Sequence, residues 1–241
     1  MNRTLAAMRT DVALQARNQL YAISVGMAVV LAGVLSWLSS PAQLHRTVPM
    51  ALLLIVGGST LLYVIAMVIL EKDDGTLQAV VVSPLRPREY LDAKIVTLSA
   101  LATLEGVIMT AGTVVWVGRD SGIHWPSPWL LVGVFALGVI HTYIGVILVV
   151  RHRRIMEALL PAGGLATLLQ VPSLYFVGAF SHPALLAIPS AAPSMLIRGA
   201  FVPLEAWEWI YALTYSAVLV VMLRRWARVA YEHHVVRKGG I

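Results

Sequence analysis

Residues Pro49–Leu70 read PMALLLIVGGSTLLYVIAMVIL, 22 consecutive positions without a charged side chain. A helix needs about 20 apolar residues to cross the roughly 30 Å hydrocarbon core of a bilayer, so this stretch predicts a membrane-spanning helix. Five other segments of the chain qualify in the same way. The six predicted spans are Leu20–Leu38, Pro49–Leu70, Ile95–Val117, Trp129–Val150, Ile155–Gly178 and Ala206–Leu223.

The composition also indicates a membrane protein. Of the 241 residues, 59% are hydrophobic and only 12% are charged, about half the charged share of an ordinary soluble domain. Mean hydropathy is +0.79. The absence of cysteine excludes disulfides and thiolate metal ligands. We therefore predict an all-α polytopic membrane protein that forms a single transmembrane domain over residues 1–241.

The segment after the quoted span, Glu71–Lys94, reads EKDDGTLQAVVVSPLRPREYLDAK. It is highly charged, yet its centre at Leu77–Val82 is almost wholly apolar. Gly75 is expected to end the preceding helix, and the prolines at positions 84 and 87 to end a short helix that starts at Thr76. The connector therefore predicts a short apolar helix between two spans.

An apolar helix exposed to the cytosol needs something to cover it. On this helix the side chains concerned are Leu77, Val80 and Val81. They either fold back on the base of the bundle or dock into a groove of a partner protein. The residues alone leave both alternatives open.

The basic residues fall on one side of the predicted bundle. With six spans, the two termini share a side with the second and fourth connectors, and that side carries fifteen Lys and Arg residues. The other side carries Arg46, Arg119 and Arg198. By the positive-inside rule both termini are predicted to be cytoplasmic. Anionic lipid headgroups account for the net charge of +6, and no nucleic-acid partner is expected.

Three segments outside the spans complete the predicted organisation. Residues 1–19 are expected to form an amphipathic helix on the inner membrane surface, and residues 224–241 a cytoplasmic tail. Residues 179–205 are apolar but interrupted by four prolines, each of which removes a backbone donor that lipid cannot replace. This segment is predicted to be a broken, re-entrant hairpin on the extracellular side.

Motifs for nucleotide binding and catalysis are missing. Gly57-Gly58-Ser59-Thr60 lacks the lysine of a phosphate-binding loop, so any ATP must be bound by another chain. Asp74-Gly75 opens a pattern like that of CDP-alcohol phosphotransferases, but Val96 stands where its last carboxylate should be. We therefore predict no catalytic residue, no metal site and no cofactor in this chain.

The connector resembles the signature of ABC-2 type transporter permeases. The matching residues are Glu71-x3-Gly75-Thr76-Leu77, Ser83-Pro84-Leu85-Arg86 and Tyr90-Leu91-x2-Lys94. In that family the segment joins the second and third of six spans and forms the coupling helix. The length of the chain and the Leu104-Glu105 pair in the third span also resemble the fluoroquinolone-export permease subset of this family. The Gly-Lys that the family carries before the third span reads Ala93-Lys94 here.

The resemblance implies a mechanism and partners. Two permeases, identical or paralogous, pair in a bacterial cell membrane, and each docks its coupling helix on a separate ATP-binding subunit that holds ATP and Mg. The pair would export a hydrophobic or amphipathic compound. The residues that the resemblance assigns to ATPase coupling are Glu71, Gly75, Thr76, Leu77, Val80, Val81, Ser83, Pro84, Leu85, Arg86, Tyr90 and Lys94.

Three polar residues inside or near the spans are candidates for the substrate path: Glu105, His141 and Glu157. Ionisable groups within a membrane are costly, so they indicate function by default. The alternatives are interhelical hydrogen bonds and, for Glu157, an ion pair with the nearby arginines. The same three residues could serve a proton-coupled secondary transporter. That function is disfavoured because the chain shows no inverted repeat and because it leaves the apolar connector unexplained.

Overall fold

The computed structural model describes residues 3–77, 85–119, 125–152, 154–180 and 182–236. Within these ranges the structure is helical and contains no strand. Six helical stretches are long and apolar enough to cross a membrane, which confirms the predicted all-α, six-span class. They are Leu20–Leu38, Pro41–Asp73, Pro87–Val117, Trp129–Val149, Ile155–Val177 and Ala206–Val235.

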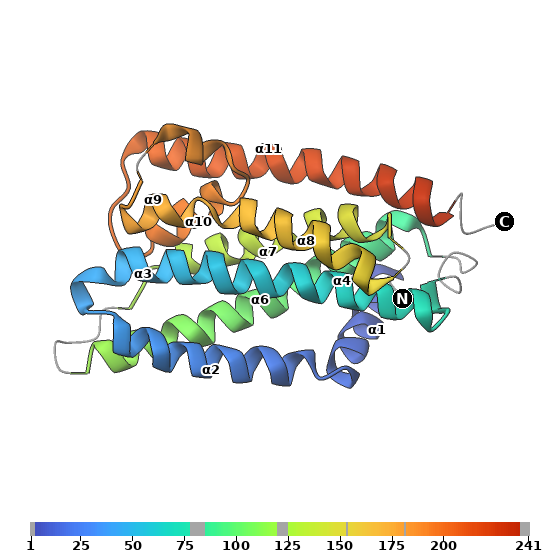
Figure 1. Cartoon of the computed structure of the whole chain (residues 1–241), viewed down its shortest axis with the longest axis horizontal. Coiled ribbons are helices and arrows are strands. Elements are labelled where there is room, and N and C mark those ends of the chain that lie inside the picture. Colours follow the sequence, from blue (N-terminus) through green and yellow to red (C-terminus); the bar gives the residue numbers. More distant parts are fainter. Residues whose placement is uncertain (1–2, 78–84, 120–124, 153, 181, 237–241) are drawn as a thin grey trace.

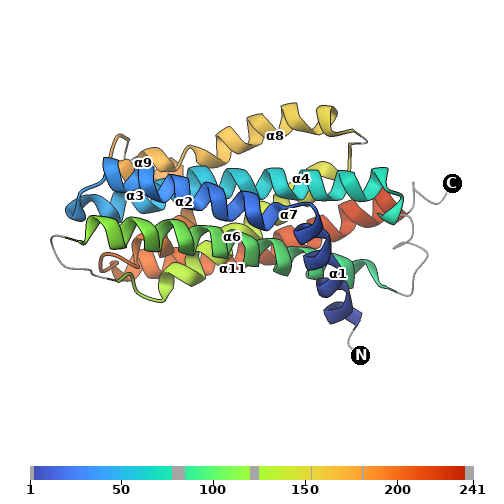
Figure 2. The same ribbon diagram turned by 90° about the horizontal axis from the view of Figure 1, so that it is seen from below.

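The spanning helices run along the long axis of the molecule, and both termini lie at one end (Figure 1). Helix α1 (Arg3–Arg17) instead crosses the bundle near that end (Figure 2). The remaining α-helices, in chain order, are α2 (Leu20–Leu38), α3 (Leu44–Ala51), α4 (Gly57–Asp73), α6 (Pro87–Val117), α7 (Trp129–Val149), α8 (Ile155–Gln170), α9 (Ser173–Val177), α10 (Ala191–Arg198) and α11 (Ala206–Tyr231).

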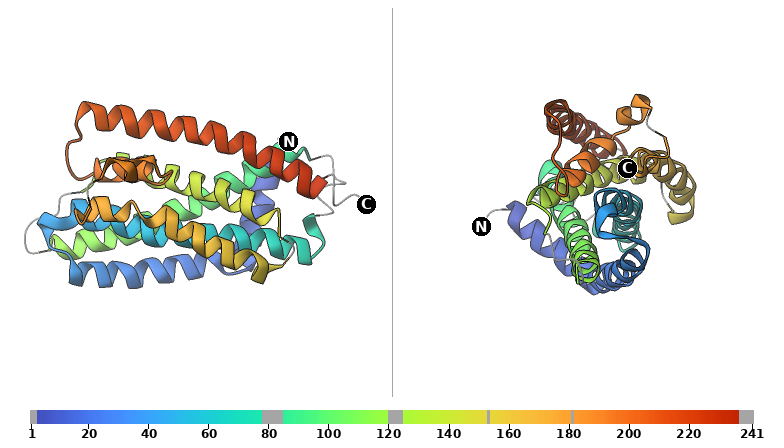
Figure 3. Two further views of the ribbon diagram at one scale, coloured as in Figure 1. Left: turned by 45° about the horizontal axis from the view of Figure 1, so that its top comes forward. Right: turned by 90° about the vertical axis from the view of Figure 1, so that its left-hand side faces the viewer.

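Helix α7 lies at the centre of the bundle and packs against α4, α6, α10 and α11. Glycines allow close approach on two of its faces. A Cβ atom added to Gly145 would lie 3.0 Å from Cβ of Val64 in α4, and one added to Gly138 would lie 3.1 Å from Cβ of Ala102 in α6. Helices α8 (gold) and α11 (red) stand at the outer edge of the bundle (Figure 3). Both present many exposed apolar side chains, as expected of lipid-facing helices.

The second span begins at Pro41, eight residues before the predicted start at Pro49. Pro49 therefore lies inside a helix, where it cannot donate a backbone hydrogen bond. The π-helical segment Leu52–Val56 (η2) follows α3 directly. The helix then continues as α4 to Asp73.

The third span also begins earlier than predicted, at Pro87 rather than Ile95. Proline suits the first helical position because it lacks the N–H that would have no partner there. The backbone N–H of Arg86 donates to the carboxylate of Glu89 over 2.8 Å, which caps the start. The charged residues before Ile95 thus extend the helix beyond its apolar part.

The segment between the fifth and sixth spans holds a short 3₁₀ turn, Pro183–Ala187, and then α10. Helix α10 is buried from Ala191 to Ile197 and contacts α3, α7 and α11. Gly133 of α7 permits this packing, since a Cβ there would lie 2.8 Å from the backbone nitrogen of Ile197. The segment therefore closes the end of the bundle opposite the termini, while its re-entrant placement in the membrane stays a prediction.

Candidate functional site

A buried ionic cluster lies at the end of the bundle that carries the connector. Lys94 of α6 is 1% exposed, and its Nζ lies 2.6 Å from Oε1 of Glu71 in α4 and 2.7 Å from Oδ1 of Asp11 in α1. The hydroxyl of Tyr90 donates to the other Glu71 oxygen. The cluster therefore joins three helices through one cation.

Each carboxylate oxygen in this cluster has a hydrogen-bond donor. The second oxygen of Asp11 accepts from Thr97 Oγ1 and, over 2.8 Å, from Gln15 Nε2. Moving an ion out of water costs several kcal/mol, and a buried pair repays that cost only when geometry and hydrogen bonds are good. We refer to Asp11, Gln15, Glu71, Tyr90, Lys94 and Thr97 as the connector clamp.

The clamp brings together three of the residues that the sequence assigned to coupling. Glu71, Tyr90 and Lys94 flank the connector, so the ion pair closes it at the points where it leaves α4 and enters α6. Sequence reasoning missed Asp11, whose partners Lys94 and Thr97 lie more than 80 positions away. The sequence does set Asp11 apart, because it is the first acidic residue of the chain and the next is Glu71.

The other connector residues occupy varied places. Gly75 takes a positive φ of 71° just after α4, as its predicted helix-ending role requires. Leu77 is 4% exposed and lies in the core cluster that includes Tyr63 and Leu91, while Leu85 is half-buried against the same cluster. For Leu77 the structure thus shows packing on the chain's own bundle, one of the two alternatives above. The predicted coupling residues Val80, Val81, Ser83 and Pro84 lie outside the described residues.

A mostly apolar cavity of about 430 Å³ adjoins the clamp. It is bounded by α1, by the start of α6 and by Thr76 and Leu85, the residues on either side of the connector's central part. The buried side chains of α1 are polar, Asp11 and Gln15, whereas Leu5 and Val12 are exposed. Helix α1 therefore contacts the bundle through these polar side chains, while Leu5 and Val12 point away from it. This orientation is consistent with the predicted placement of α1 on the membrane surface.

Two of the predicted substrate-path residues meet the same turn of α4. Glu105 of α6 is fully buried, and both of its carboxylate oxygens lie 3.1 Å from Oγ of Ser59. His141 of α7 is 1% exposed and donates from Nδ1 to the carbonyl oxygen of Leu137 over 2.9 Å. Its ring packs against Gly57, where an added Cβ would lie 2.9 Å from Nε2. We refer to Gly57, Ser59, Glu105 and His141 as the intramembrane pair site.

Glu157 does not join this site. It lies in the first turn of α8 and is exposed, near the connector end of the bundle. Sequence reasoning missed Gly57 and Ser59 as partners, although both stand out as small residues in an apolar span. It also missed Gln170, whose side-chain amide donates to the carbonyl oxygen of Leu54 in the π-helical segment over 3.1 Å.

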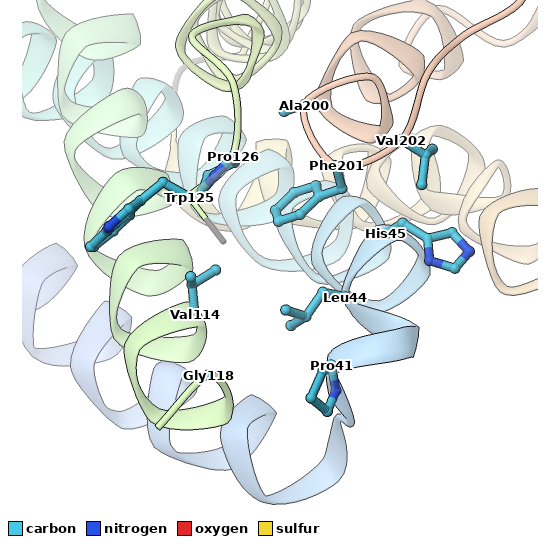
Figure 4. A pocket seen from close by; sticks show the side chains of 10 residues that line it. All are labelled: Pro41, Leu44, His45, Val114, Gly118, Trp125, Pro126, Ala200, Phe201 and Val202. Atoms are coloured by element: carbon cyan, nitrogen blue, oxygen red, sulfur yellow. The ribbon is translucent and has the colours of Figure 1, made fainter. Parts of the chain in front are cut away.

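A second cavity, of about 270 Å³, lies at the opposite end of the bundle, and Figure 4 shows the side chains that line it. Trp125, Phe201 and His45 supply its rings, from the chain before α7, the turn after α10 and the helix that starts at Leu44. If the termini are cytoplasmic, this aromatic-lined hollow faces outside. In the described part of the chain, no group of three or more His, Asp or Glu side chains is arranged to hold a metal ion.

Comparisons with known proteins identify the family of this chain. The family model described as the fluoroquinolones export permease protein family matches residues 2–239. Two similar proteins are the fluoroquinolones export permease proteins of Mycobacterium tuberculosis strains CDC 1551 and H37Rv. Each is 27% identical over 245 residues, covering the whole of both chains. This chain therefore belongs to the fluoroquinolones export permease protein family.

Proposed function

We propose that this multi-pass membrane protein is the permease subunit of an ATP-binding cassette exporter. A separate subunit would bind ATP and Mg, and a second copy or a paralogue would complete the transmembrane pair. Support comes from the family, whose members are named export permeases, and from the connector motif. No sequence motif for nucleotide binding occurs in the chain itself.

The connector clamp is the observation that carries this proposal. Because Glu71 and Lys94 pair at 2.6 Å in a buried site, the ends of α4 and α6 cannot separate without leaving a charge unpaired. A push on the connector would therefore move both helices, and Asp11 would pass the movement to α1. A partner that changes shape on ATP hydrolysis needs such a rigid attachment.

We place the substrate path beside the intramembrane pair site. Glu105 and His141 are closed off from solvent in this conformation, so α4, α6 and α7 must part for a substrate to reach them. The names of the relatives give fluoroquinolones as their cargo. For this chain we propose export of an amphipathic, drug-like compound of that kind, with the aromatic-lined outer cavity on its way out.

The alternative, a proton-coupled transporter, draws support from Glu105 and His141 facing the same turn of α4. Its third member, Glu157, lies apart and exposed at the start of α8. A proton relay through all three residues is therefore interrupted in this structure. The cassette exporter, unlike the proton-coupled transporter, also gives the connector clamp a role.

One reconstitution separates the two functions. The permease is co-expressed with an ATPase encoded by a neighbouring gene, placed in vesicles, and assayed for fluoroquinolone movement. The proposal predicts transport with ATP and no pH gradient, and none from the permease alone. Transport driven by a pH gradient in vesicles without the ATPase would establish the alternative instead.

Sidedness is tested by labelling, because the chain has no native cysteine. Ala184→Cys lies on an exposed residue of the segment between the last two spans, and Asp73→Cys on an exposed residue at the connector. We expect an impermeant maleimide to label the first from outside the cell and the second only after lysis. The reverse pattern would invert the proposed orientation.

A further inference from the structure

We propose that a basic pocket between α6, α7 and α11 binds the phosphate of an anionic phospholipid. The pocket has a volume of about 200 Å³ and lies at the end of the bundle that carries the termini. Its walls come from the start of α6, the later part of α7 and the last turns of α11. The lining residues are Arg88, Leu91, Asp92, Tyr143, Arg224, Arg225 and Arg228.

Positive charge exceeds negative charge in this pocket, with four arginines against one aspartate. Arg224 pairs with Asp92 at 2.8 Å, and Arg228 pairs with Glu232 at 2.9 Å. Arg88 and Arg225 have no acidic partner within the described ranges of the chain. Like charges gathered in one pocket repel each other, so an anion there lowers the energy of all four.

The residue types suit a phosphate. An arginine guanidinium presents a planar fork of N–H donors that matches phosphate oxygens, often in two parallel hydrogen bonds. The Arg224–Asp92 ion pair holds one of these guanidinium groups at the pocket wall, over 2.8 Å. Tyr143, buried in α7, contributes a phenol to the lining. The pocket thus combines one ion-paired arginine with two exposed arginines that have no acidic partner among the described residues.

The surface beside the pocket indicates that the phosphate belongs to a lipid. Val218, Val221 and Met222 of α11 are exposed and apolar, and Arg225 follows Met222 by three positions and Val221 by four. Residues spaced by three or four share one face of a helix. An acyl chain can therefore lie on this stripe while its headgroup reaches the arginines.

A tryptophan beside the pocket indicates that the pocket lies at the boundary between the acyl chains and the headgroups. Trp226 is exposed on α11, and the guanidinium of Arg151 lies 6.0 Å from its ring centre. Tryptophan is enriched at the boundary between acyl chains and headgroups. Basic pockets between transmembrane helices on the cytoplasmic side are a known setting for anionic headgroups. The position of the pocket and its residues therefore both favour an anionic lipid headgroup as the ligand.

Native mass spectrometry of the full-length chain in detergent tests the proposal. Phosphatidylglycerol and phosphatidylcholine with identical acyl chains are the probes. We expect phosphatidylglycerol to bind at least about tenfold more tightly, and Arg88→Gln with Arg225→Gln to abolish that preference. These two arginines are chosen because their replacement breaks no ion pair among the described residues. Arg88→Lys with Arg225→Lys, which keeps the charge, should retain part of the preference and shows that the fold survives.

The matched control removes the same charge elsewhere. Arg9→Gln with Arg154→Gln alters two exposed arginines outside the pocket and should leave the preference unchanged. An equal loss in this control, or no preference in the wild type, would overturn the site. Binding of glycerol phosphate or inorganic phosphate as tightly as the lipid would show a site for soluble phosphates. Loss of a co-purifying ATPase from the glutamine variant, with the lipid preference kept, would assign the pocket to an acidic protein surface instead.

Discussion

The connector clamp and the intramembrane pair site are both buried and polar, but only the clamp pairs its carboxylates with a cation among the described residues. In the clamp, one ammonium lies between two carboxylates, and every carboxylate oxygen accepts a hydrogen bond. At the intramembrane pair site, both oxygens of Glu105 lie 3.1 Å from the hydroxyl of Ser59, and among the described residues no salt bridge joins Glu105 to a cation. Carboxylates that share a buried ammonium hold one geometry, whereas an acid held by hydroxyls alone can change partners without breaking an ion pair. We therefore propose that the clamp is rigid and that the intramembrane pair site contacts the substrate.

The largest effect is expected from Lys94→Met. This change leaves the carboxylates of Asp11 and Glu71 buried without their cation, and removing one partner of a buried ion pair costs about 3–5 kcal/mol. We expect the free energy of unfolding in a denaturing detergent to fall by that amount. The triple variant Asp11→Asn, Glu71→Gln, Lys94→Met removes all three charges and should recover part of the loss. A Lys94→Met protein as stable as the wild type would contradict the clamp.

A smaller loss, about 1–3 kcal/mol, is expected from Gly57→Ala. The added methyl would lie 2.9 Å from Nε2 of His141, so the imidazole must turn in a packed core. Gly163→Ala is the matched control, because no atom lies within 4 Å of a Cβ added at that exposed helical position. Thermal unfolding of both variants tests the comparison. Equal melting temperatures would show that His141 does not pack as closely as the structure shows.

Asp11→Asn should cost about 1–2 kcal/mol, less than loss of Lys94, because Lys94 keeps its pairing with Glu71. The change weakens only the attachment of α1. We expect faster hydrogen exchange in Arg3–Arg17, with exchange in α4 and α6 unchanged. Uniformly faster exchange across all three helices would show that α1 is not a separately attached element.

Sequence reasoning predicted the six spans because the apolar length of a spanning helix is a local property. It placed the start of the second span at Pro49 rather than Pro41, since a proline marks a helix start as readily as it disturbs a helix interior. It named Glu71 and Lys94 by family resemblance, but not the ion pair between them. Asp11 and Ser59 were missed because their partners lie tens of positions away, and only the packed helices bring them together.

The smallest change in stability and a clear change in transport are expected from Glu105→Gln. Glutamine keeps the size of the side chain and can still accept from Ser59, so the free energy of unfolding should shift by less than about 1 kcal/mol. If Glu105 contacts the substrate, losing its charge should slow ATP-dependent export of cationic compounds about tenfold and spare neutral ones. Glu105→Leu supplies the control, because a purely structural polar group replaced by leucine in an apolar core would make the purified protein more stable without altering export. That outcome would remove Glu105 from the substrate path and leave the clamp as the buried polar site tied to function.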